Sequence, residues 1–213
     1  MKKGQIKTYT VRKVTPSHSG RTKLVPWNEA VALADFNFPW EDSSAPVLEF
    51  KAVHDTEWLY CFFNVIDKDV SVYSSTNQKN EVLYGDRVEI FLSPDRLLST
   101  YYALEIDYLA RVYDYKASFY RVFDAKWSWP QGHIDVRASK TDEGYQVFLN
   151  LSLDSLSRLG LLKGNEMITG IFRGKCAAAG PAMDAMRWIS WLSPDSETPD
   201  FHIPSAFGVF RLD

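Results

Sequence analysis

The sequence contains few cysteines, no long apolar run and no dense cluster of basic residues, and each absence narrows the class of protein. No apolar run approaches the ~18 residues that a membrane-spanning helix needs, so we predict no membrane partner. The 24 lysines and arginines are outnumbered by 27 aspartates and glutamates, which gives a formal net charge of -3. Because no basic patch is interleaved with rings, we do not expect nucleic acid as a partner.

The compartment is left open by the amino terminus and by the cysteines. The first residues, MKKGQIKTYTVRK, are basic but lack the apolar segment of an export signal, so as written the chain carries no such signal. It is either a cytoplasmic protein or a mature chain written with a start Met. Cys61 in LYCFFNV and Cys176 in GKCAAAG fit two buried thiols as readily as one disulfide.

Motifs for nucleophilic catalysis and for zinc are missing as well. There is no Gly-x-Ser-x-Gly elbow, and neither cysteine has a histidine close in sequence. The four histidines, at positions 18, 54, 133 and 202, show no paired ligand spacing. We interpret His54, in a turn, as structural, and His202, beside Phe201 in PDFHIP, as the better functional candidate.

What the sequence does contain is a repeated β-strand signal. Hydrophobic residues make up 46% and aromatic residues 15% of the chain, and short alternating segments recur between turn signals. Helical periodicity is convincing only in SLDSLSRLGLL, where Ser152 or Asp154 can cap and Gly160 can terminate. We therefore predict an all-β fold over residues 1–213, one β-sandwich domain of jelly-roll or immunoglobulin-like character with one short helix. The opening IKTYTVRKV reads as an edge strand.

Two hairpins and a tryptophan-containing loop complete this pattern. VLEFKAVH and WLYCFFNV are expected to pair across a turn at 55–57, and the apolarity of the second strand indicates burial on both faces. A second hairpin is expected around the turn at 142–144. Trp58 and Trp191 lie in strands and are assigned to the core. Trp127 and Trp129 either extend a binding platform or plug one end of the sandwich, and we favour the plug.

The stretch from Tyr84 to Tyr115 is the most informative, because its charged residues alternate with apolar ones. Successive side chains of a strand point to opposite faces. If the three strands are neighbours, one face carries the following residues: Arg87, Glu89, Phe91, Ala103, Glu105, Asp107, Arg111, Tyr113 and Tyr115. Carboxylates, guanidinium groups and rings together can bind a neutral polyhydroxylated ligand such as a sugar. The alternative is a solvated face whose ion pairs contribute roughly 0–1 kcal/mol each.

The order of several segments carries a family resemblance. The matching segments are HDTEWLYCFFNVID, DRVEIFLSPD, YYALEIDYLARVYDY, DEGYQVFLNLSL, and ISW followed by a loop and PSAFGVFRL. From about residue 24 to the carboxyl end, this order resembles carbohydrate-binding module family 9, the β-sandwich domains known from bacterial xylanases. The resemblance implies non-catalytic binding of a polysaccharide or oligosaccharide such as xylan, a role in polysaccharide breakdown, a glycoside hydrolase partner and an extracytoplasmic location.

The resemblance also implies candidate binding residues. Xylanase-type modules hold a sugar between two tryptophan rings, assisted by a Glu on the VEIF strand and an Arg on the next hairpin. Glu89 and Arg111 match the Glu and the Arg, while Phe201 and Leu83, with Tyr84 beside it, occupy the tryptophan positions. A clamp of Tyr84 and Phe201 is then expected. The predicted ligand-binding set is Glu89, Arg111 and Phe201, followed by Arg87, Tyr84, Glu105, Asp107 and His202.

Calcium is a further implication, because members of the family resemble calcium-binding domains. Asp67 and Asp69 in NVIDKDV offer the carboxylate oxygens that a hard cation prefers. The alternative, which we favour, is that these are two solvated loop acids.

Two other functions are consistent with the residue types. A glycoside hydrolase could use Glu89 and Glu105 on adjacent strands, but a neighbouring arginine lowers a carboxyl pKa and so disfavours a general acid. Related sandwich domains bind haem through a Met and a His, and Met183, Met186 and His202 supply these types. The commoner use of methionine is to fill irregular gaps in a core.

Overall fold

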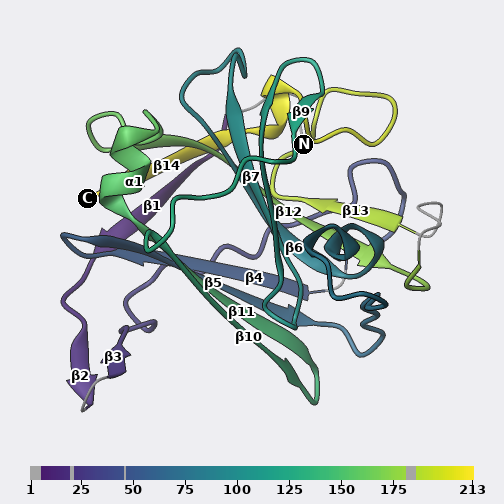
Figure 1. The fold of residues 1–213 in the computed structure, drawn as a ribbon, viewed down its shortest axis with the longest axis horizontal. Helices are drawn as coiled ribbons and strands as arrows, with labels where there is room; N and C mark the ends of the chain where they lie inside the picture. The colour runs from purple at the N-terminus through teal and green to yellow at the C-terminus, as the bar shows by residue number, and fades with distance from the viewer. Residues whose placement is uncertain (1–5, 20–21, 46, 181–185) are drawn as a thin grey trace.

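The computed structural model describes residues 6–19, 22–45, 47–180 and 186–213, and it shows two β-sheets joined at strand β1 (Figure 1). The first sheet, called the β5 sheet here, consists in spatial order of β10 (Ile134–Thr141), β11 (Gly144–Ser152), β5 (Trp58–Ile66) and β4 (Val47–His54). The second, called the β6 sheet, consists of β14 (Gly208–Leu212), β12 (Glu166–Cys176), β6 (Arg87–Ser93), β7 (Tyr101–Ile106), β8 (Val112–Ser118) and β9 (Val122–Asp124).

Smaller elements surround these sheets. They are β13 (Met186–Ser190), which pairs with β12, the hairpin of β2 (Ser17–Ser19) and β3 (Thr22–Leu24), the helix α1 (Leu153–Arg158), and the 3-10 helices η1 (Lys79–Tyr84) and η3 (Pro204–Ala206). Among the described residues, no helix is both long and apolar enough to cross a lipid bilayer. The all-β sandwich with one short α-helix is confirmed.

Strand β1 (Thr8–Lys13) has a central place, and the prediction of an edge strand is wrong. It pairs in parallel with β14 on one side and with β4 on the other. Tyr9 and Val11 point inward and are buried between the sheets, while Thr8, Thr10 and Arg12 are exposed. The alternation of TYTVRK therefore supplies one apolar face to the interior at the junction of the two sheets.

The interior is formed by the apolar faces that the alternation predicts. Val88, Ile90 and Leu92 of β6 are buried in one cluster with Leu104 and Ile106 of β7. The facing strand β5 contributes a further set, Leu59, Cys61, Phe63 and Val65. On its other face Tyr60 is buried, but Trp58, Phe62 and Asn64 are only half-buried, so the prediction that the whole strand is buried on both faces is wrong.

Local signals in the sequence fix the turns, the helix and the thiols. Ser152 caps α1 by accepting a hydrogen bond from the Ser155 backbone N–H, and Gly160 follows the helix at φ 70°. Trp129 is buried and donates to the Ser155 hydroxyl at 3.2 Å, as a plug would.

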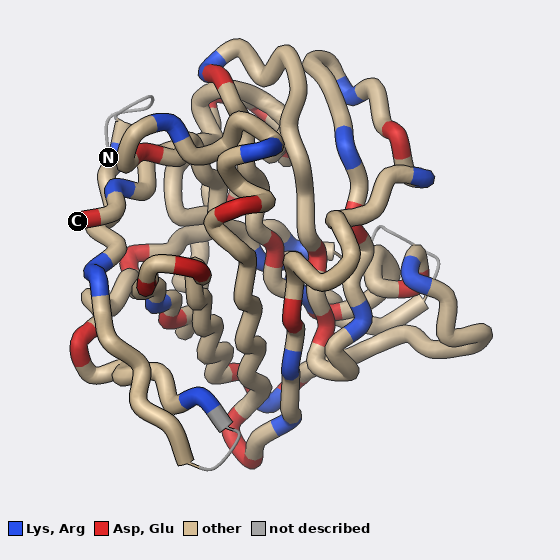
Figure 2. Tube along the Cα trace, turned by 60° about the vertical axis from the view of Figure 1, so that its left-hand side comes forward, with Lys and Arg blue, Asp and Glu red and all other residues tan. Residues whose placement is uncertain are grey.

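The two cysteines are free, buried thiols rather than a disulfide. Charged residues of both signs are interspersed along the chain (Figure 2).

Candidate functional site

The β6 sheet brings the predicted ionic and aromatic side chains onto one face, on the side away from the interior. Glu89 of β6 lies opposite Glu105 of β7, which lies opposite Tyr113 of β8. The face is not open, however. Phe201 and Phe207, from a covering segment of residues 192–207, are buried in a second apolar cluster on this face together with Phe91, Tyr101, Ala103, Tyr115 and Phe172. The face that the sequence suggested for sugar binding is therefore covered by protein over these rings.

Arg87, Glu89 and Glu105 form a buried ionic group beneath this cover. The Arg87 Nε lies 2.5 Å from Glu105 Oε2 and 3.0 Å from Glu89 Oε1, and all three side chains are at most 5% exposed. Burial and the neighbouring Glu105 carboxylate raise the pKa of Glu89 to about 8. Arg87 does act to lower this pKa, as expected, but desolvation and Glu105 outweigh it, so the expectation of a net lowered pKa is wrong. Both carboxyl groups are walled off, whereas a glycosidase needs two that face a scissile bond.

Three residues with half-buried rings, Tyr84, Tyr113 and Trp188, neighbour this ionic group, and we call them the Trp188 rim. Tyr113 lies opposite Glu105, and Tyr84 lies between Leu83 and Gly85, whose carbonyls accept hydrogen bonds from Arg87. The Arg87 guanidinium lies 5.3 Å from the centre of the Trp188 ring. Gly174 of β12 lies between them, opposite Arg87 on one side and opposite Trp188 on the other. A Cβ at position 174 would come within 3.0 Å of the Arg87 guanidinium, so glycine leaves the space for this contact.

Sequence analysis missed Trp188 and did not select Tyr113. Trp188 is separated from Arg87 by about a hundred residues, and only the pairing of β12 with both β13 and β6 brings the two together. A signal for Tyr113 was present, because it alternates in register with Arg111 and Tyr115 on the face that carries Glu105.

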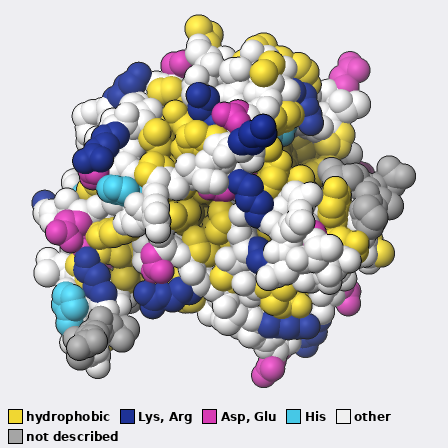
Figure 3. Space-filling view, viewed as in Figure 1, with side chains coloured by type: hydrophobic (Ala, Val, Ile, Leu, Met, Phe, Trp, Pro, Cys, Tyr) yellow, Lys and Arg dark blue, Asp and Glu magenta, His cyan; other side chains and the backbone are white. Residues whose placement is uncertain are grey.

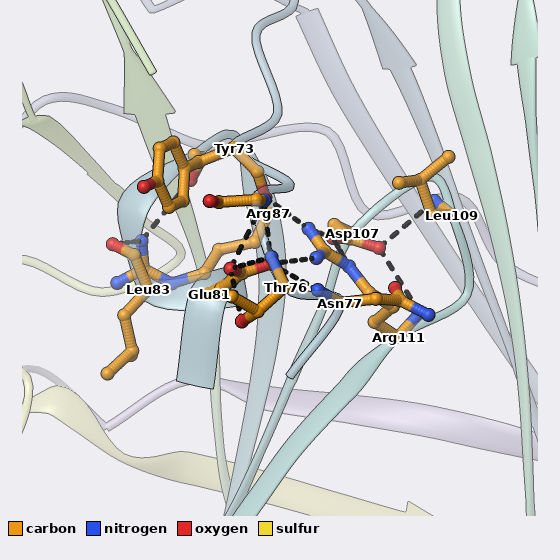
Figure 4. Close-up of polar contacts among 11 residues, drawn as sticks. Tyr73, Thr76, Asn77, Glu81, Leu83, Arg87, Asp107, Leu109 and Arg111 are labelled. Atoms are coloured by element: carbon orange, nitrogen blue, oxygen red, sulfur yellow. Dashed lines mark hydrogen bonds and ion pairs between the residues drawn. The ribbon is translucent and has the colours of Figure 1, made fainter. Parts of the chain in front are cut away.

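Arg111 belongs to a different group, in which every nitrogen of its guanidinium is engaged (Figure 4). Its Nε donates to Asp107 Oδ2 at 2.8 Å, one terminal nitrogen donates to Glu81 Oε2 at 3.1 Å, and the other donates to the Tyr73 carbonyl at 2.6 Å. Glu81 also accepts from three backbone N–H groups, those of Ser75, Thr76 and Asn77. Arg111 and Asp107 therefore hold the loop before η1 against the β7–β8 turn, and they are buried rather than presented to a ligand.

Phe201 and His202 lie in the covering segment, where Phe201 is buried and His202 is half-buried beside a small pocket that Trp188 also lines. The Phe201 ring stacks on Phe172 with centroids 4.1 Å apart and is 5% exposed. His202 Nδ1 lies 2.9 Å from the Tyr101 hydroxyl, and burial together with the nearby Arg121 lowers the pKa of His202 to about 4. The expected clamp of Tyr84 and Phe201 does not form, because the covering segment packs Phe201 onto the sheet.

The remaining predicted residues concern metals and haem. Asp67 Oδ2 accepts from Arg173 at 2.6 Å and is also paired with Lys175, while Asp69 is exposed. These cationic side chains neutralise the carboxylate, so the residues do not fit a calcium site. Of the methionines considered for haem, Met186 lies in β13 and Met183 lies outside the described residues.

The fold and this face together define a class of protein, the β-sandwich domains in which aromatic and ionic side chains gather on one sheet face. More narrowly, the chain belongs to the family described as carbohydrate family 9 binding domain-like, whose model matches residues 22–213.

Solved structures of similar fold agree with this assignment. A candidate carbohydrate-binding protein from Bacteroides uniformis has a TM-score of 0.71 and 19% identity, covering 98% of this chain and 100% of that chain. A family 9 carbohydrate-binding module from Caldicellulosiruptor kristjanssonii in complex with glucose has a TM-score of 0.57 and 20% identity, covering 97% and 96%. The same kind of module in complex with cellotriose has a TM-score of 0.60 and 18% identity, covering 97% and 94%. A search of curated proteins found no match.

Proposed function

We propose that this chain binds carbohydrate at the Trp188 rim without altering the ligand chemically. The observation that carries the proposal is the placement of Trp188 directly over the Arg87–Glu105 ion pair. Membership of the carbohydrate family 9 binding domain-like family supports the ligand class. So do the related modules, of similar fold, that were solved with glucose and with cellotriose.

The chemistry of the rim suits a sugar. Its half-buried rings can cover the apolar C–H face of a pyranose, and the two tyrosine hydroxyls can donate and accept hydrogen bonds. Arg87, Glu89 and Glu105 act from below, because their fixed ion pairs hold the guanidinium under Trp188 and so orient the ring. The site is shallow, and we expect modest affinity with water-mediated contacts at its edge.

Fluorine NMR of protein labelled with 5-fluorotryptophan tests the site directly, since the chain has seven tryptophans. We expect cellotriose or xylotriose to shift the Trp188 signal saturably, and Trp188→Ala to abolish this component of the binding heat in calorimetry. Trp191 is 1% exposed in the same part of the fold, and its signal is the internal control that stays in place. If the Trp188 signal does not move at millimolar sugar, the rim is not the binding site.

Finer assignments stay predictions. We propose that the family type is the xylanase-associated one, that xylan is a ligand in polysaccharide breakdown, and that a glycoside hydrolase is a partner. We also propose that residues 1–213 form one domain. Comparing the affinities for xylotriose and cellotriose tests the ligand, because a preference for cellotriose would contradict the xylan assignment.

A further inference from the structure

We propose a second carbohydrate-binding site, on the other sheet, in a groove that takes a neutral oligosaccharide chain. The groove lies on the outer face of the β5 sheet and has a volume of about 690 Å³. The residues that line it include Lys23, Trp27, Trp58, Asp135, Arg137, Phe148 and Asn150. Its residues are separate from those of the Trp188 rim, so this inference stands apart from the function proposed above.

The floor of the groove is a regular array of rings and polar groups. Strand pairing aligns two rows across β10, β11 and β5, Asp135–Asn150–Tyr60 and Arg137–Phe148–Phe62. Phe62 and Phe148 are half-buried, whereas Tyr60 is 2% exposed and its hydroxyl donates to Asp55, so Tyr60 supports the floor from beneath. Neighbouring strands lie about 4.8 Å apart, and side chains on one face repeat about every 6.8 Å along a strand. The Phe148 ring therefore has Arg137 beside it across the strands and Asn150 beside it along its own strand. A pyranose needs this combination, because its ring face is apolar and its hydroxyls project from the edge.

One wall is built by the segment that follows β3. The Trp27 ring leans against Phe62 and Phe148, with centroids 5.4 Å and 6.1 Å apart. Figure 1 shows the β2–β3 hairpin projecting from the body of the sandwich, and Figure 3 shows it as an arm set off by a notch in the outline. The opposite wall is formed by the side chains of Asp135 and Arg137, which end the two rows on the edge strand β10. Together, the two walls form a trough that can hold a chain lying across the strands.

The charges of the groove favour a neutral ligand. The charged residues among the described lining are Lys23, Asp135 and Arg137, and each forms an ion pair. Lys23 Nζ pairs with Asp55 at 2.6 Å, while Asp135 Oδ2 accepts from Arg137 and from Asn150, each at 3.1 Å. Each of the two lining cations is thus matched by a carboxylate, so the described lining offers no excess of positive charge that would attract an anionic sugar. A neutral one can use the remaining donors and acceptors as they stand.

The same features disfavour a protein partner. The apolar surface of a partner would bury Asn150 and Ser139 against groups that cannot hydrogen-bond with them, which is costly. Strand β10 is the edge of the sheet, but it carries Arg137 and Lys140, and charged side chains on an edge hinder pairing with another strand. A polyhydroxylated chain satisfies both the rings and the polar groups.

The experiment uses the full chain labelled with 5-fluorotryptophan and titrated with cellohexaose, xylohexaose and hexagalacturonate. We expect a neutral hexasaccharide to shift the Trp27 and Trp58 signals saturably, while the Trp191 signal stays in place. Trp27→Ala should weaken the affinity of the groove for the hexasaccharide at least tenfold. Where loss of the indole disturbs folding, Asn150→Ala should do the same. The matched control, Trp188→Ala, should leave the affinity of the groove unchanged.

Each other outcome overturns the proposal. Trp27 and Trp58 signals that stay in place at millimolar hexasaccharide exclude a sugar site in the groove, whatever the Trp188 signal does. Tighter, salt-sensitive binding of hexagalacturonate contradicts the neutral ligand. Shifts that follow protein concentration rather than sugar, with a dimer in gel filtration, assign the groove to a second copy of the chain.

Discussion

At the scale of single residues, the ionic side chains of the β6 sheet serve the fold before they serve a ligand. Arg87 and Arg111 each have two carboxyl groups within 3.1 Å. Arg173 is likewise paired with Asp67 and Asp86 in the interior. Such groups lose much of their hydration on burial, so their ion pairs compensate a cost rather than add large stability. Removing one partner of such a pair leaves the other charge buried without compensation and lowers the stability of the fold.

The raised pKa of Glu89 predicts a pH dependence of stability. Its folded pKa of about 8 lies above the ordinary value of 4.5, so the folded protein holds this proton more tightly than the unfolded chain does. The resulting stabilisation is complete below the ordinary value and is lost as pH rises through the folded value. Between about pH 5 and 8, the free energy of unfolding should fall relative to Glu89→Gln by up to about 1.4 kcal/mol per pH unit.

Urea unfolding at several pH values measures this difference. Glu143→Gln is the matched control, because Glu143 is 63% exposed and its variant should run parallel to the unmodified protein. Parallel curves for Glu89→Gln as well would mean that Glu89 is ionised in the folded state.

At the scale of elements, segments without regular structure decide which parts of the β6 sheet are accessible. The covering segment buries Phe201 and leaves Trp188 half-exposed at its margin. The loop before η1 is fixed by Glu81, which Arg111 connects to the β7–β8 turn. A sugar could therefore reach rings at the rim but not the ionic groups below them.

The role of Arg111 as a clamp predicts a loss of stability on its removal. Arg111→Ala leaves Asp107 buried without its cation, and the free energy of unfolding should fall by about 3 kcal/mol. Arg158→Ala is the control, because Arg158 is 72% exposed and its ion pair with Asp154 should contribute only about 0–1 kcal/mol. Equal stability of the two variants, with sugar binding lost only in Arg111→Ala, would instead assign Arg111 to the ligand site.

At the scale of the whole molecule, the two sheets depend on the strand that they share. β1 pairs with β14 in one sheet and with β4 in the other. The outer face of one sheet then carries the Trp188 rim, and the outer face of the other carries the groove. Both proposed sites are therefore on one rigid support, facing different ways.

Substitutions in β1 test this dependence. Val11 is fully buried between the sheets, whereas Arg12, the next residue, points to solvent. Val11→Asp should abolish cooperative thermal unfolding because it places a charge at the junction, while Arg12→Asp should keep it. A cooperative transition retained by Val11→Asp, seen by circular dichroism, would show that the sheets hold together without β1.

The sequence by itself determined the all-β class, the alternating faces of β6 and β7, the capped helix and the family. These depend on local alternation and turn residues, which neighbouring positions specify completely. It also placed Glu89 and Glu105 on one face, since strand period alone decides that. The alternation Gln146, Phe148, Asn150 already contained the signal for the groove floor, although Trp58 was assigned to the core.

Only the tertiary structure decided which of these faces meets water. Phe201 lies about thirty residues after Phe172, and nothing local in either segment shows that the later one folds over the earlier. The place of β1 between two sheets, the contact of Trp188 with Arg87 through Gly174, and the burial of Arg111 have the same origin. Each of these features depends on contacts between segments that are far apart in the sequence. Whether a side chain is exposed depends on which distant segment packs over it, and the residues around it in the sequence do not determine that.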